Sequence, residues 1–405
     1  MTPDLVEVPV WLKENPHKWN VVPLKAAFKR VKRKPDLSMG IVTAFRDGEV
    51  TLRSNRRIDG FTEAEEFDTY QTINVGDLVI HSMDAFAGCI GVSDSIGIGS
   101  PVLSVCEPIG ANDPRFMSYQ LRVMANCGWI EALSRSVRER TSEFRWKEAG
   151  SQKVLLPSPA EQVRIADYLD SELAEIDTLI ARQQQLVALL VEREKNYIFQ
   201  SVTEGLNDGC SMSDSEISWL PRIPSHWTLT RARFLCRIST GSGDTQDAVE
   251  EGEFPFYVRS DTPLTSKKYE FEGVSVLTAG DGAGVGKVFH LVDGKFMAHQ
   301  RVYVLHSFKD VLPEFFYYSF KSTFALIALD GSAKSTVDSV RRPMLANLPI
   351  PLPPLGEQLQ IVDKLREHIA KNSKLIEAAE ATVSKLFERR ESLIASVITG
   401  KRKIA

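Results

Sequence analysis

The sequence predicts an α+β protein in which two mixed α/β globular domains are each followed by one long helix. The first observation is an internal repeat, because residues 161–205 recur as residues 357–400 at an offset of 196, and a self-match of this length fixes the architecture. The second is a fainter repeat at the domain edges, where Trp19 aligns with Trp227 at an offset of 208. The predicted globular domains and helical segments alternate along the chain, as residues 1–155, 156–206, 207–350 and 351–405.

The first globular stretch contains short apolar runs separated by turn residues, which predict strands. These runs are residues 40–43, 77–80 and 102–105, and a helix is predicted after them over residues 114–136. We interpret Trp19 and the aromatic residues of that helix as core.

Residues 206–218 are small and polar, so we predict a linker ahead of the second domain. That domain is again mixed, with strands predicted at residues 256–258, 274–277, 287–289 and 302–305 and a helix over residues 313–329. Its edges match those of the first domain while its interior differs. Such a pattern is expected of two domains that recognise different targets.

The repeated segments predict long amphipathic helices, because apolar residues recur at steps of three, four or seven. The predicted seam is Ile165, Leu169, Ile176, Ile180, Val187 and Leu190 in the first copy, and Ile361, Leu365, Ile376, Val383, Leu386 and Leu393 in the second. Three residues mark the start of the first helix: Ser158 as the cap, Pro159 at the first helical position, and Glu161 three residues after the serine. About 40 residues at 1.5 Å each give a rod of roughly 60 Å.

The charges of the two helical segments predict that they pair with each other. Residues 156–206 contain 4 basic and 9 acidic residues, whereas residues 351–405 contain 10 basic and 7 acidic residues. Opposite net charge beside matching apolar seams favours mutual pairing over self-pairing. In the alternative interpretation each helix belongs only to the core of its own domain, although a globular core rarely needs two amphipathic helices of this length.

The composition is that of an ordinary globular protein, with 43% hydrophobic and 25% charged residues among 405. No apolar run approaches the length of a membrane span, and the N-terminus lacks a charged-then-apolar leader. We therefore expect a cytoplasmic protein that does not associate with membranes. The five cysteines are scattered without CxxC spacing, which favours reduced thiols over a zinc site or disulfide framework.

The glycine-rich residues 280–287 look like a phosphate loop but fit no phosphate-binding spacing. A Walker motif would need Gly at 281 and Ser or Thr at 288, where the sequence has Asp281 and Val288. We interpret the run as a turn between strands, from which Lys287 could meet a DNA phosphate. Elsewhere no histidine or cysteine spacing indicates a metal site, and no nucleophile–base signature occurs.

Basic clusters are the stronger signal, because Lys and Arg neutralise phosphates and Arg can form paired hydrogen bonds with a base edge. We predict DNA contacts at Lys29, Arg30, Lys32, Arg33, Lys34, Arg53, Arg56, Arg57, Arg138, Arg140, Arg259, Lys267, Lys268, Lys287, Lys334, Arg341 and Arg342. The competing interpretation of any one of them is a solvated charged face. Both globular stretches are close to neutral overall.

The starts of the two helical segments resemble those of a known family. Residues 156–162 (LPSPAEQ) and 352–358 (LPPLGEQ) look like the PLPPLxEQ segment of HsdS, the specificity subunit of type I restriction-modification systems. The IDTLI, ERR and VITGK segments within the helices are also similar to that family, as is the GSAK segment before the second helix. The resemblance covers nearly the whole chain, with modest departures at Ala160, Glu194 and Glu204.

The resemblance implies a function and partners. In this family each variable domain is a target recognition domain that reads one half of a bipartite site in double-stranded DNA. The helices pair as an antiparallel coiled coil with pseudo-twofold symmetry, set the spacing, and dock methyltransferase subunits, of which we expect two. A restriction and translocation subunit is a further expected partner. The chain itself is expected to be non-catalytic and without cofactor, since S-adenosylmethionine, ATP and Mg belong to the partner subunits.

Three alternatives stay open. The chain could serve a methyltransferase-only complex that has no restriction subunit. It could be a coiled-coil adaptor without a nucleic-acid role, although that explains the helices and not two diverged domains with matching edges. It could be an enzyme that binds a nucleotide at residues 280–287, which tight ATP binding by the isolated chain would favour.

Overall fold

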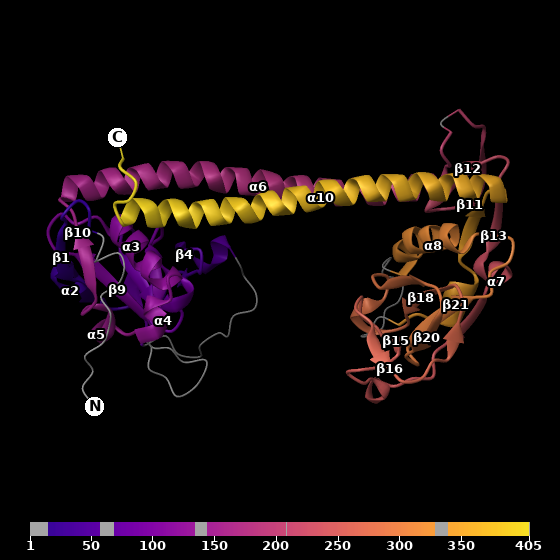
Figure 1. Cartoon of the computed structure of the whole chain (residues 1–405), viewed down its shortest axis with the longest axis horizontal. Coiled ribbons are helices and arrows are strands. Elements are labelled where there is room, and N and C mark those ends of the chain that lie inside the picture. The colour runs from indigo at the N-terminus through magenta and orange to yellow at the C-terminus, as the bar shows by residue number, and fades with distance from the viewer. Residues whose placement is uncertain (1–14, 57–68, 134–143, 208, 329–338, 405) are drawn as a thin grey trace. The chain divides into compact units, whose positions relative to one another are not determined.

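The computed structural model describes residues 15–56, 69–133, 144–207, 209–328 and 339–404 (Figure 1). The chain divides into two compact units, Met1–Arg182 with Thr382–Ala405, and Gln183–Ala381. Each unit contains one globular domain and a part of each long helix. In the described part of the chain, no helix is both long enough and apolar enough to cross a membrane.

The first domain consists of β1 (Asn20–Pro23), α2 (Leu24–Ala27), β2 (Phe28–Val31), β3 (Val42–Ala44), β4 (Val50–Leu52), β5 (Gln71–Ile73), β6 (Leu78–His81), β7 (Ile90–Val92), β8 (Gly97–Gly99), β9 (Leu103–Pro108), α3 (Pro114–Asn126), α4 (Trp129–Leu133), α5 (Trp146–Ala149) and β10 (Lys153–Leu156). Its main sheet is antiparallel, in the order β2-β9-β6-β7. Side chains alternate along β6, so Leu78 and Ile80 pack with α3 while Val79 packs with the strands of a second layer.

The second domain consists of β11 (Met212–Ile217), β12 (Leu220–Pro224), β13 (Thr228–Arg231), α7 (Ala232–Leu235), β14 (Arg237–Thr240), β15 (Phe254–Tyr257), β16 (Leu264–Ser266), β17 (Phe271–Glu272), β18 (Ser275–Ala279), β19 (Phe289–Val292), β20 (Lys295–Ala298), β21 (Val302–His306), α8 (Pro313–Ala328), α9 (Arg342–Ala346) and β22 (Pro349–Leu352). Its main sheet is also antiparallel, in the order β14-β21-β18-β19. Val276 packs with α8, whereas Leu277 packs with the second layer.

The two domains therefore repeat one scaffold. The sheet β2-β9-β6-β7 corresponds to β14-β21-β18-β19, helix α3 corresponds to α8, and the pair β1-β10 corresponds to β13-β22. The second layers differ, since the first domain has two separate pairs, β3-β4 and β5-β8, and the second has a four-stranded sheet, β16-β15-β20-β17. Trp19 and Trp227 are buried in both scaffolds, as the sequence predicted.

The two long helices are α6 (Pro159–Thr203, 45 residues) and α10 (Leu355–Ile398, 44 residues). In the first unit they run antiparallel, because Tyr168 meets Arg402 and Asp177 accepts a hydrogen bond from Arg390 Nε at 3.1 Å. They run antiparallel in the second unit too. There the Asn372 amide donates to the Leu190 carbonyl at 3.2 Å, and further along α6 Tyr197 stacks on His368.

The predicted seam residues are buried or half-buried in each unit. In the first unit Ile165, Leu169, Ile176, Ile180 and Leu393 are buried in one cluster, against which Val383 and Leu386 are partly buried. In the second unit Leu190, Ile361 and Leu365 are buried, and Val187 and Ile376 are half-buried.

A buried glutamine joins each long helix to its domain. Gln162 Oε1 accepts from the Asp113 amide ahead of α3 at 2.9 Å, and its Nε2 donates to the Pro157 carbonyl at 2.9 Å. Gln358 makes the same contacts, accepting from the Leu312 amide at 2.8 Å and donating to the Pro353 carbonyl at 2.9 Å. Both side chains are fully buried. The repeated Glu-Gln pair thus includes the residue that orients each helix on its sheet.

An ion pair at the same interface has opposite polarity in the two units. Arg115 of α3 donates to Asp170 of α6 at 2.7 Å. At the aligned positions Glu314 of α8 accepts from Arg366 of α10, with Nε at 2.9 Å and Nη2 also in contact. The arginine of the pair lies on the domain helix in the first unit and on the long helix in the second.

Three local predictions were wrong. The helix expected over residues 114–136 ends at Asn126, because Gly128 adopts a left-handed φ of 76° before α4 begins; residues 134–136 lie outside the described residues. Residues 206–218, expected to be a linker, include strand β11, which pairs with β12. The strand expected at residues 287–289 begins only at Phe289, because the Lys287 and Val288 amides bond back to the Gly284 carbonyl in a turn.

Replacing either glutamine should destabilise its unit. Gln358→Ala removes two hydrogen bonds and leaves the partly buried Leu312 amide without its partner, which costs on the order of 2–4 kcal/mol. Gln162→Ala should act alike in the other unit. Thermal unfolding followed by circular dichroism measures the loss, with exposed Gln360→Ala on the same helix as the matched control. Equal midpoints for Gln358→Ala and Gln360→Ala would mean that the buried amide does not hold the helix.

Candidate nucleic-acid interface

Both domains have a pocket at the same point of the shared scaffold. In the first it lies where β6 leads through a short turn, η2 (Ala85–Ala87), towards β7. In the second it lies where β18 leads through η4 (Gly282–Gly284) towards β19. An aspartate immediately precedes each turn, Asp84 and Asp281, and lines the pocket. Equivalent loops therefore place a carboxylate in the wall of each pocket.

Glycines let these loops approach the backbone of an arginine. A Cβ on Gly88 would lie 2.8 Å from the Arg46 carbonyl oxygen, and a Cβ on Gly284 would lie 2.6 Å from that of Arg259. Arg46 follows β3 and Arg259 follows β15, so both arginines belong to the second layer of their domain. A side chain at either glycine would push the loop away from that layer. The glycine-rich residues 280–287 are thus a turn between strands, as the sequence predicted.

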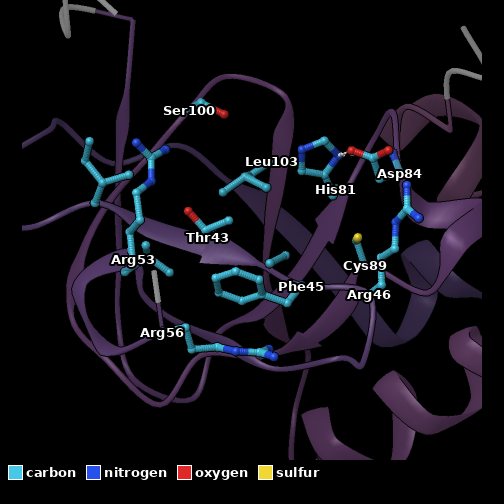
Figure 2. Close-up of a pocket in the computed structure, with 13 residues that line it drawn as sticks. Thr43, Phe45, Arg46, Arg53, Arg56, His81, Asp84, Cys89, Ser100 and Leu103 are labelled. Carbon is cyan, nitrogen blue, oxygen red and sulfur yellow. Dashed lines mark hydrogen bonds and ion pairs between the residues drawn. The ribbon is translucent and has the colours of Figure 1, made fainter. Parts of the chain in front are cut away.

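The pocket of the first domain has a volume of about 600 Å³ and is lined by basic, aromatic and hydroxyl side chains. Figure 2 shows Arg46, Cys89 and Asp84 on one side of it and Arg53 on the other, with Thr43 and Phe45 between them. Its remaining lining residues are Ile41, Val42, Ala44, Arg56, His81, Ser100 and Leu103.

Arg56 is held at the rim of this pocket. Its Nη1 lies 2.6 Å from an Asp47 carboxylate oxygen and 3.0 Å from one of Glu49. Its guanidinium carbon lies 4.4 Å from the centre of the Phe45 ring. The arginine is therefore fixed by two carboxylates and an aromatic face, which gives it a defined orientation.

Burial shifts the pKa of two titratable groups in the first pocket. Burial lowers the pKa of His81, although the neighbouring Asp84 carboxylate acts in the opposite direction. Burial raises the pKa of the Cys89 thiol to about 11. The thiol is therefore neutral near pH 7, whereas a cysteine nucleophile must be a thiolate.

The pocket of the second domain has a volume of about 420 Å³. Asp281 lies 2.9 Å from Arg259 Nη1 and 3.4 Å from Arg301 Nη1. His299 is buried against Phe256, and its Nδ1 accepts from the Arg301 amide at 3.0 Å. Burial, and then the Arg259 guanidinium, lower the pKa of His299, so the imidazole is neutral near pH 7.

Both pockets offer hydrogen-bond donors and acceptors. Within the described ranges, no group of three His, Cys, Asp or Glu side chains could hold a metal ion. Arginine, carboxylate and hydroxyl groups in an open pocket suit recognition of a polar edge.

The structure brings only some of the predicted DNA contacts to the pockets. Arg53 and Arg56 line the first pocket and Arg259 lines the second, while Lys287 is exposed on the loop after η4. The remaining described residues lie elsewhere: Lys29 and Arg30 on β2, Lys32, Arg33 and Lys34 just after it, Lys267 and Lys268 after β16, and Arg341 and Arg342 at the start of α9. Arg57, Arg138, Arg140 and Lys334 lie outside the described residues.

Arg33 differs from the other predicted contacts because it is part of a structural ion-pair network. Its guanidinium lies 2.5 Å from Asp77 and 2.5 Å from Glu107, and Glu107 also pairs with Lys29 at 3.0 Å. The hydrogen bond to Asp77 is the main cause that raises the pKa of Arg33. Arg33 therefore joins β2 to β6 and β9 rather than projecting from the surface.

Sequence reasoning missed Arg46, Asp281 and Arg301. The basic-cluster criterion passed over Arg46 and Arg301 because neither is close to another basic residue in the sequence. A usable signal was present, since Asp84 and Asp281 each stand between an apolar strand and a run of small residues. Comparing those two positions across the repeat would have found both loops.

Comparison with known proteins gives matches of one kind. The family model described as the type I restriction modification DNA specificity domain matches residues 224–384. The EcoDI specificity subunit of a type I restriction enzyme from Escherichia coli is 26% identical over 178 residues, which are 44% of this chain. The match covers 38% of that subunit, so the chain aligns with less than half of its length.

Solved structures share the fold. One chain from a structural study of complex assembly and conformational transition of the type I R-M system has a TM-score of 0.70 at 16% identity, covering 94% of this chain and 97% of that one. The HsdS subunit from Thermoanaerobacter tengcongensis has a TM-score of 0.50 at 16% identity, covering 99% of this chain and 100% of that one. The family match thus lies on the second domain, and the solved structures share the fold of nearly the whole chain.

Proposed function

We propose that this chain is the DNA-reading subunit of a type I restriction-modification complex, and that residues 1–155 and 207–350 each read one half of a bipartite site. The observation that carries this proposal is one scaffold, used twice, with a different pocket at the same point. Specificity subunits of this family are non-catalytic. The pockets present oriented arginines beside hydrogen-bonding side chains, which suits the reading of a base edge.

The pair formed by α6 and α10 would set the distance between the two half-sites. A continuous α-helix is stiff and has a fixed rise per residue, so its length defines a distance. In the first unit the predicted seam residues of both helices are buried in one cluster. In the second unit Asn372 of α10 donates to the Leu190 carbonyl of α6, and Tyr197 of α6 stacks on His368 of α10. We infer that the unspecified gap in the DNA site has one fixed length.

Mapping of adenine methylation tests this proposal. The chain, co-expressed with its methyltransferase partner, should give a genome-wide pattern of two short specific blocks around one fixed gap. A continuous motif would mean that only one domain reads DNA. An assembled complex, supplied with S-adenosylmethionine, that methylates no defined motif would favour the adaptor interpretation.

Lys267 and Lys268 are proposed phosphate contacts of the second domain. Both are exposed and follow β16. A lysine that neutralises a phosphate releases a counterion, so Lys267→Ala or Lys268→Ala should weaken binding to every sequence and reduce the slope of log K against log salt by about 1. Fluorescence anisotropy of a labelled duplex at several salt concentrations measures that slope. Exposed Lys309→Ala is the control, and an unchanged slope for the lysine variants would remove them from the interface.

Exposed apolar side chains on the long helices are proposed docking points for two methyltransferase copies. Large apolar residues are exposed at the same positions of both repeats, as the pairs Val163 and Leu359, Leu179 and Leu375, and Val191 and Phe387. Solvated helix faces ordinarily carry polar residues at such positions. Apolar exposure at three repeat-related positions is expected if two identical partners bind equivalent surfaces.

A negative charge introduced at one of these paired positions should reduce the number of bound methyltransferase copies one at a time. Leu179→Asp and Leu375→Asp should each lose one methyltransferase copy, and the double variant both, because a buried carboxylate is costly at an apolar interface. Native mass spectrometry of the purified complex counts the copies. Gln184→Asp, exposed on α6, is the control. If both single variants retained two copies, these leucines would not belong to the docking surface.

A further inference from the structure

In the second domain one carboxylate holds two arginines. Asp281 Oδ1 lies 2.9 Å from Arg259 Nη1 and Asp281 Oδ2 lies 3.4 Å from Arg301 Nη1. The carboxylate side chain is 18% exposed, whereas those of Arg259 and Arg301 are 48% and 61% exposed. Asp281 is therefore the least exposed member of this group, and Asp281 and Arg259 line the pocket.

The backbone around Asp281 is fixed from several sides. A Cβ on Gly280 would lie 2.8 Å from the Arg301 carbonyl oxygen, and a Cβ on Gly284 would lie 2.6 Å from that of Arg259. The Gly280 amide donates to the Arg301 carbonyl at 2.7 Å, and the Gly280 carbonyl accepts from the Val340 amide at 2.8 Å. The glycines thus allow the loop to press against both arginines, so the carboxylate is oriented before any ligand arrives.

The charge balance favours a base edge over a phosphate. Two arginines and one aspartate leave a net charge of about +1, and the carboxylate would repel a phosphate placed beside it. Guanine presents two uncharged acceptors, O6 and N7, that match a guanidinium with two free N–H groups. Each arginine contacts Asp281 through Nη1, and no other side-chain partner of either guanidinium occurs in the described ranges.

Building on the proposed function, we infer that Arg259 and Arg301 read guanine in the half-site of the second domain, with Asp281 as their positioning residue. The first domain lacks this arrangement. There Asp84 is hydrogen-bonded to His81 through its backbone amide, and Val102 stands at the position aligned with Arg301. Guanine recognition of this kind is therefore confined to one half of the site.

Methylation mapping of variants in the co-expressed complex tests the inference. Arg259→Gln and Arg301→Gln should each lose roughly tenfold or more of the preference for guanine at one position. Methylation should persist on the relaxed motif, and the other half-site and the gap should stay unchanged. Arg259→Lys should not restore the preference, because an ammonium group cannot form the paired contact. Exposed Arg222→Gln on β12 is the control with the same charge change.

Asp281→Asn separates positioning from contact. It keeps the size of the side chain but weakens its hold on both arginines, so guanine preference should fall while overall DNA affinity does not. The melting temperature of each variant checks its folding. If Asp281→Asn does not fold, Arg259→Gln and Arg301→Gln alone test whether these arginines read guanine.

The outcomes separate this inference from the proposed function. A split motif without guanine in either half, or one unaltered by the arginine variants, would overturn the inference alone. Equal loss of binding to all sequences at an unchanged melting temperature would make the arginines phosphate contacts and would also overturn it. A wild-type complex without a split motif would overturn the proposed function itself.

Discussion

A fully buried side-chain amide, present once in each unit, determines how a long helix starts. Gln162 and Gln358 each bond the end of the preceding strand and the backbone ahead of the domain helix. The strand belongs to the small pair β1-β10 or β13-β22, and the domain helix covers the main sheet. One residue therefore ties three elements together, and the direction of the long helix follows from the position of the sheet within the unit.

The features that the sequence predicted best depend on local or periodic patterns. The long helices follow from apolar spacing, and the matching domain edges follow from repeated aromatic residues. The features it predicted poorly depend on tertiary contacts. A helix broken at Gly128 and a hairpin formed by β11 and β12 have weak local signals, because a glycine or a polar run is compatible with several conformations.

Charge in the sequence was an incomplete guide to the pockets. Arg33 and Arg56 look alike as members of basic runs, yet Arg33 joins three strands while Arg56 lies at a pocket rim. Arg46 and Arg301 are isolated in the sequence and reach their positions only through the fold. The glycine-rich run has a structural explanation without phosphate, since its glycines allow a loop to contact the backbone of two arginines. Comparison of the two domains was more informative than any single motif.

The reversed polarity of the ion pairs has a consequence for modular exchange. Arg115 meets Asp170 in one unit, while Glu314 meets Arg366 in the other. A second domain grafted onto the first helix would bring two carboxylates together, and the reciprocal graft would bring two guanidinium groups together. Each graft would therefore replace an ion pair with two like charges, and a charge reversal at one of the two positions would restore the pair.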